Sequence, residues 1–190
     1  MPVAVACFYR GKSSIDLLVR AVTRRKGQAF ADVPSHCAVV LPSPYQGRGF
    51  NTASTLFEYV STGWHSRMPD TGDIAWSYEV PLVNMDAAIK RAETDRGRYR
   101  WWVDGAIGIA RWIPNRWYLR WPKLSHLAYR HICSLFLKDV LRDGNWPCPD
   151  WLLVQECPAS PCDLLFAVRE TNGIAANETL PLDTLTHAAG

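Results

Sequence analysis

Four short apolar segments rich in valine and aromatic residues constrain the fold of this chain most strongly. They are VAVACFY (3–9), SHCAVVL (35–41), TLFEYV (55–60) and DIAWSYEVPL (73–82). β-Branched and aromatic side chains fit a pleated, half-buried surface, and Pro34 and Pro42 bound the second segment. Each segment is therefore predicted to be a strand. No apolar run approaches the ~20 residues that a helix needs to cross a bilayer.

Helical patterns interrupt these strands. In SSIDLLVRAVTRR, Ser13 and Asp16 have the spacing of a capping box, and four apolar residues fall on one helical face: Ile15, Leu18, Val19 and Val22. NMDAAIKRAETDRG is predicted to be a second helix, capped by Asn84, with Asp86 in its first turn and Gly97 after its end. A third helix contains Cys133 and ends before Gly144 and Pro147.

The last apolar segments, WLLVQE (151–156) and DLLFAV (163–168), are predicted to be short closing strands. The predicted class is therefore α+β, with an antiparallel sheet packed against helices. A chain of 190 residues suits one compact domain. We place this domain at residues 1–170 and a polar C-terminal tail at 171–190.

Composition and charge exclude several classes of protein. The apolar share of 48% and the charged share of 21% are ordinary for a globular domain, and a net charge of +3 is too small for a dedicated nucleic-acid binder. The start, MPVAVACFYRGK, has no basic residue before its apolar stretch and no clear cleavage site. We therefore expect a cytoplasmic protein, with virion association or release at lysis as alternatives.

Six cysteines form no CxxC pair, and disulfides are not expected in a reducing compartment. Cys148, Cys157 and Cys162 lie close together, but their spacings differ from those of zinc knuckles. We expect neither a metal nor another cofactor.

Cys133 raises a different question, because it stands at the start of an apolar helix. A helix that begins near Arg130 would lower the pKa of this thiol, whereas a helix capped at Ser125 would place it two turns inside.

A nucleophilic cysteine needs a base and a group that orients the base. The candidate bases are His36, His65, His126, His131 and His187. His36 opens a short strand and shares a face with Ala38 and Val40, while Cys37, Val39 and Leu41 share the other face. The next strand offers Glu58, whose carboxylate can accept a hydrogen bond from the imidazole and fix its tautomer.

The order SHCAVVL, LFEYVSTG, HICSLFLKDVL and SPCDLLF resembles the circularly permuted branch of the NlpC-type papain-like superfamily. That branch contains bacterial and phage amidases and relatives of lecithin:retinol acyltransferase. The resemblance spans residues 3–168 and implies that His36 is the base, Glu58 the orienting group and Cys133 the nucleophile. It also implies that peptidoglycan stem peptides are the substrate, with lipid or other acyl groups as the alternative.

The chain departs from the pattern of this superfamily at three places. It lacks the GD pair that often precedes the first helix, it has Leu135 where a glutamate is common, and the interval between His36 and Glu58 is long. Two rival arrangements also remain. His126 lies seven residues before Cys133, so one helix would place both on one face. Cys7 would be the nucleophile in the ordinary papain order, but it lies in a predicted strand.

The segment 96–121 interleaves tryptophan and arginine more densely than the rest of the chain. These residues can complete the core under arginine stems, line a cleft, or bind bases or a membrane interface.

The sequence as a whole leaves two functional classes. One is a cysteine peptidase or amidase acting on a peptide, glycopeptide or acyl substrate. The other is a non-enzymatic module with the same fold, which binds phage tail or virion proteins.

Overall fold

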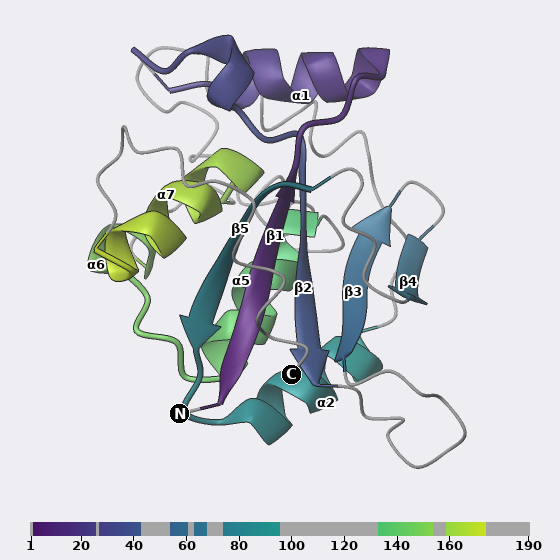
Figure 1. Ribbon diagram of the computed structural model, residues 1–190, viewed down its shortest axis with the longest axis vertical. Coiled ribbons are helices and arrows are strands. Elements are labelled where there is room, and N and C mark those ends of the chain that lie inside the picture. The colour runs from purple at the N-terminus through teal and green to yellow at the C-terminus, as the bar shows by residue number, and fades with distance from the viewer. Residues whose placement is uncertain are drawn as a thin grey trace, which may run out of the picture.

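The computed structural model describes residues 2–25, 27–42, 54–60, 63–67, 74–95, 133–153 and 159–173. Its centre is a five-stranded antiparallel sheet with the order β4-β3-β2-β1-β5 (Figure 1). The strands are β1 (Val3–Tyr9), β2 (His36–Pro42), β3 (Ser54–Val60), β4 (Gly63–Arg67) and β5 (Ile74–Pro81). The predicted α+β class and its antiparallel sheet are confirmed.

The helices are α1 (Ser14–Thr23), α2 (Met85–Thr94), α5 (Cys133–Asp143), α6 (Asp150–Leu153) and α7 (Pro161–Thr171), with a 3₁₀ turn at Phe30–Asp32. Helices α5 and α7 pack against the strands of this sheet, and α1 lies across one end of it (Figure 1). Helix α5 packs against β2 and β3 and touches α2 and α7. Helix α1 lies across the end of the sheet where β1 ends and β2 begins (Figure 1). In the described part of the chain, no helix has the length and apolarity that a membrane crossing requires.

The two faces of the sheet carry two apolar clusters. On one face, Cys37, Val39 and Leu41 of β2 pack in a core with α5 and α7. The other face carries a smaller cluster formed by Cys7, Tyr9, Ala38, Leu56 and Ile74. The alternation predicted for β2 is therefore confirmed, since its odd and even residues join different clusters.

Local sequence explains where the helices begin. Ser13 and Asp16 form the predicted capping box of α1, and the Asn84 side chain caps α2 by accepting a hydrogen bond from the backbone of Ala87. Ser160 and Asp163 form a second capping box at α7, with Pro161 in the first turn. Each box satisfies backbone N–H groups that a helix end leaves without partners.

The two closing strands predicted at 151–156 and 163–168 are wrong. Residues 150–153 form α6, and residues 163–168 lie inside α7. Apolar runs this short do not distinguish a strand from a buried helix by periodicity, and the Ser160–Pro161–Asp163 cap decides in favour of the helix. Strand β4 was not predicted, because GWHSR has no alternation of apolar and polar residues.

The four apolar residues that fall on one face of α1 differ in their exposure. Of the four apolar residues placed together, Val19 is buried, Val22 is half-buried, and Ile15 and Leu18 are exposed. The segment 96–121, Gly97, Cys157 and residues 174–190 lie outside the described residues.

Replacing a core leucine of α5 tests this packing. Leu137 is fully buried between α5 and the sheet, so Leu137→Ala leaves a cavity and should lower the free energy of unfolding by about 2–5 kcal/mol. Leu17→Ala is the matched control, because Leu17 is exposed on α1, and it should change that free energy by about 0.5 kcal/mol or less. Urea denaturation followed by circular dichroism measures both. Equal losses in the two variants would contradict the packing of α5.

Candidate active site

His36 is the first residue of β2, and backbone contacts fix the chain just before it. Ser35 donates its backbone N–H to the carbonyl of Tyr9 at 2.9 Å, and its hydroxyl oxygen accepts the N–H of Gly11 at 3.0 Å. Tyr9 is the partner of His36 across the ladder, and their ring centroids lie 5.4 Å apart. The backbone of His36 is therefore fixed at the start of β2, and its side chain is 18% exposed.

Glu58 reaches His36 from the neighbouring strand. It lies opposite Ala38 in the antiparallel register of β2 and β3, which places it on the same face of the sheet as His36 and one pair further along. The distance between Nε2 of His36 and Oε2 of Glu58 is 3.1 Å. The Glu58 side chain is only 7% exposed, and a buried carboxylate needs such a partner to offset its lost hydration.

Cys133 is the first residue of α5, which runs to Asp143. The helix packs against β2 and β3, and its first residue interacts with His36 and Cys37 at the start of β2. The sulfur is hydrogen-bonded to the His36 ring and to the Cys37 side chain and backbone. The structure thus brings together all three residues singled out in the sequence, one each from β2, β3 and α5.

The surroundings of Cys133 favour the thiolate. Hydrogen bonding from the Cys37 side chain is the largest influence, and the charge and hydrogen bond of His36 and the Cys37 backbone act in the same direction. Burial opposes them, because it disfavours a charged sulfur. The balance holds the pKa of Cys133 well below its usual value. The residue is 2% exposed, so this thiolate is stabilised by specific partners and not by water.

His36 is correspondingly held as an imidazolium. Burial by itself would lower the pKa of this ring, but the negative charge and hydrogen bond of Cys133, followed by those of Glu58, outweigh it. Together they raise the pKa of His36 to about 10. Both shifts favour a thiolate–imidazolium pair, with the Glu58 carboxylate behind the imidazolium. Because the protons of the two groups are linked, they titrate as a pair.

Cys7 shows the opposite behaviour in the same molecule. It lies in the middle of β1, fully buried on the face that carries Glu58. Burial and then the charge of Glu58 raise its pKa to about 12. Cys7 is thus a core thiol, and the papain-order alternative, with Cys7 as the nucleophile, has no activated sulfur.

Of the remaining candidate residues, His65 lies beside Glu58, one strand further from His36, and the others are not part of the described site. His65 is exposed on β4, directly opposite Glu58 in the register, and His126, His131 and His187 lie outside the described residues. Cys162 donates a hydrogen bond to Oε1 of Gln28 at 3.1 Å, away from Cys133. Within the described ranges, no group of three or more histidine, cysteine or acidic side chains is arranged to hold a metal ion.

Sequence reasoning missed Cys37 as a neighbour of the thiol. Strand alternation places Cys37 on the face opposite His36, and alternation alone predicts two separate environments for them. Helix α5 covers the Cys37 face and brings its first residue into contact with Cys37 as well as with His36. The adjacency of His36 and Cys37 in the sequence was the available signal, but a strand pattern alone does not show where a distant helix begins.

Comparison of the chain with models of protein families, with curated proteins and with solved structures gives no match. The chemistry of the site therefore has to be argued from its own residues.

The unequal acidity of the cysteines is directly measurable. Thiolate absorbance near 240 nm should persist in the wild type well below the pH at which an ordinary thiol is protonated and disappear there in Cys133→Ser, because the pKa of Cys133 is lowered by its neighbours. His36→Gln removes the positive charge, so the pKa of Cys133 should rise and the low-pH absorbance should be lost. Cys148→Ser is the control, since burial raises the pKa of Cys148. Persistence of the low-pH signal in Cys133→Ser would disprove the assignment.

Proposed function

We propose that this protein is a thiol hydrolase that cleaves amide bonds, with Cys133 as the nucleophile, His36 as the general acid and base, and Glu58 as the group that orients His36. The observation that carries the proposal is the grouping of Cys133, His36 and Glu58, with Glu58 at 3.1 Å from the ring and surroundings that lower the pKa of Cys133 and raise that of His36. A thiolate is the reactive form of cysteine, and its pairing with a protonated histidine is the arrangement of thiol hydrolases.

The reaction proceeds in two halves. The Cys133 sulfur attacks the carbonyl carbon, and a tetrahedral oxyanion forms that backbone N–H groups at the start of α5 are suited to stabilise. The His36 imidazolium gives its proton to the departing nitrogen as the C–N bond breaks, which leaves a thioester on Cys133. Neutral His36 then takes a proton from water, the hydroxide attacks the thioester carbonyl, and the acid leaves as the thiolate–imidazolium pair is restored.

Glu58 contributes through His36. In the imidazolium the Glu58 carboxylate accepts the Nε2–H of the ring, which leaves the proton on the other ring nitrogen for transfer in the reaction. It also stabilises the imidazolium that the first half of the reaction requires. This is the role of the third member of a hydrolytic triad.

For the substrate we propose peptidoglycan stem peptides. This choice rests on the resemblance of SHCAVVL, LFEYVSTG and HICSLFL to the permuted NlpC-type superfamily. The superfamily membership and its permuted papain-like fold are part of the same proposal.

Digestion of purified muropeptides tests the reaction and the substrate together. Mass spectrometry should reveal products shortened by hydrolysis of one amide bond in the presence of wild-type protein. Cys133→Ala should lower the rate by at least about 1,000-fold, because no other group replaces the nucleophile. Cys148→Ala is the matched control and should keep the wild-type rate, since Cys148 lies outside the site. Cleavage that survives in Cys133→Ala would rule out the proposed mechanism.

The dependence of kcat/KM on pH tests the roles of His36 and Glu58. Activity needs the thiolate and the imidazolium at once, so it should fall in acid as Cys133 is protonated and in base as His36 loses its proton near pH 10. In Glu58→Gln the loss of the carboxylate charge lowers the pKa of His36, and the basic limb should move to lower pH. An unchanged basic limb in Glu58→Gln would contradict the role given to Glu58.

A further inference from the structure

Helix α1 presents its apolar residues to solvent and its polar residues to the protein. Among its described side chains, Ile15 is 61% and Leu18 57% exposed, and Leu17 and Ala21 are exposed beside them. The buried positions are Val19, Arg20 and Thr23. At about 100° per residue, Leu17, Ala21, Leu18, Val22 and Ile15 lie within one arc of about 160°, in which Ser14 is the single polar position. A helix that only covered a core would face the other way.

Polar contacts fix this orientation. Thr23 donates its hydroxyl to the carbonyl of Val19, and Arg20 donates to the carbonyl of Phe30 at 2.7 Å while lying over its ring at 4.2 Å. The capping box of Ser13 and Asp16 closes the first turn of the helix itself. Turning the apolar arc of α1 inward would therefore break the hydrogen bond from Arg20 to the carbonyl of Phe30.

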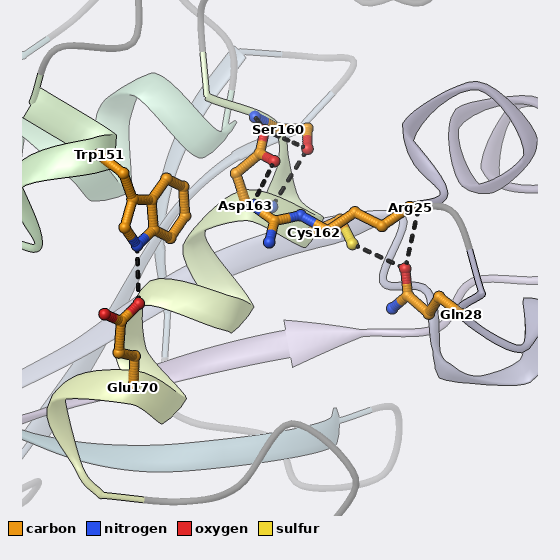
Figure 2. Close-up of polar contacts among 7 residues, drawn as sticks. All are labelled: Arg25, Gln28, Trp151, Ser160, Cys162, Asp163 and Glu170. Atoms are coloured by element: carbon orange, nitrogen blue, oxygen red, sulfur yellow. Dashed lines mark hydrogen bonds and ion pairs between the residues drawn. The ribbon is translucent and has the colours of Figure 1, made fainter.

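The chain that follows α1 is fastened to α7 (Figure 2). Arg25 contacts Asp163 at 3.2 Å, and its guanidinium lies 4.9 Å from the ring centre of Trp151 and 4.4 Å from that of Phe166. Gln28 accepts a hydrogen bond from Cys162 of the same helix at 3.1 Å. The C-terminal end of α1 is thus fastened to α7 through Arg25 and Gln28.

Basic residues surround the apolar arc. Residues 10–25 contain five basic side chains, Arg10, Lys12, Arg20, Arg24 and Arg25, against the single acidic residue Asp16. Arg10, Lys12 and Arg24 are exposed. The carboxylate of Asp16 is engaged by the Ser13 hydroxyl and backbone. An exposed aliphatic surface with a cationic border is complementary to a negatively charged lipid interface.

We infer that α1 is a docking surface for an anionic lipid membrane, into which Ile15, Leu17 and Leu18 insert while Arg10, Lys12 and Arg24 contact the headgroups. A helix of ten residues is roughly 15 Å long and offers less area than the ~800 Å² per partner of a stable protein interface. Its exposed residues are aliphatic, whereas protein interfaces favour aromatic anchors. Membrane docking through α1 does not depend on the proposed hydrolase activity.

Docking through α1 would also orient the molecule. Helix α1 lies over the end of the sheet where β2 begins, and His36 is the first residue of β2 (Figure 1). The same end of the sheet that carries His36 would therefore be turned toward the lipid surface.

Co-sedimentation with lipid vesicles tests this inference on the full chain. Wild-type protein should bind vesicles of equal parts phosphatidylcholine and phosphatidylglycerol, and the binding should weaken in high salt. The double variant Ile15→Ser and Leu18→Ser should lower the partition coefficient at least about tenfold, because two inserting aliphatic side chains are lost. Lys12→Gln with Arg24→Gln should reduce it several-fold on these vesicles.

Val83→Ser is the matched control, because Val83 is 67% exposed but lies just after β5, outside α1. It should bind like the wild type, and thermal unfolding should show that all variants are folded. Failure of the wild type to bind the mixed vesicles, or equal binding by the Ile15→Ser and Leu18→Ser double variant, would overturn the inference. So would a wild-type dimer in sedimentation analysis that this double variant dissociates, because α1 would then bind protein.

Discussion

The contact between His36 and Cys133 is the interaction on which the site depends, because it joins the sheet to the helical layer through two opposite charges. Burying an isolated thiolate or an isolated imidazolium would be costly. Here each charge is stabilised by the other, and Glu58 adds a carboxylate behind the ring. Neither residue alone would hold its charge at this depth, which explains why the neighbouring Cys7, buried without a cation, stays protonated. The difference between the two thiols is one of partners, not of burial.

Sheet topology makes this contact available. Strand β2 lies between β1 and β3. Its first residue, His36, therefore has Tyr9 of β1 on one side and Glu58 of β3 on the other. Helix α5 then has to begin close to that strand end, and its buried residues Phe136, Leu137, Val140 and Leu141 fix its position on the sheet. The apolar packing of α5 thus places the sulfur, while the antiparallel register of β2 and β3 places the base and its carboxylate. The site is built from three elements that pack rigidly, which suits a geometry that must be held before substrate binds.

The strands of the first half of the chain could be predicted because their patterns are local. Alternation assigned the two faces of β2, and the residue types at Ser13 and Asn84 located the starts of α1 and α2. The grouping of His36 and Glu58 followed from adjacent strands. The position of Cys133 could not be predicted in this way, because no residue near it marks the start of the helix. Its pairing with His36 rested on a family resemblance.

Two segments near the C-terminus were assigned wrongly as strands because a six-residue apolar run fits either structure. Ser160 and Asp163, however, have the spacing of a helix cap.

Helix α1 shows why periodicity alone does not orient a helix. The spacing of its apolar residues correctly predicted an arc, but such spacing indicates only that two sides of a helix differ, not which side meets the protein. The orientation is decided by contacts that are distant in the sequence, such as Arg25 with Asp163 and Gln28 with Cys162, which fasten the following chain to α7. Arg20 faces inward, where it donates a hydrogen bond to Phe30, and the leucines lie on the outward side of the helix. Exposing aliphatic side chains in this way raises the free energy of the isolated molecule, and a lipid surface at α1 would recover it.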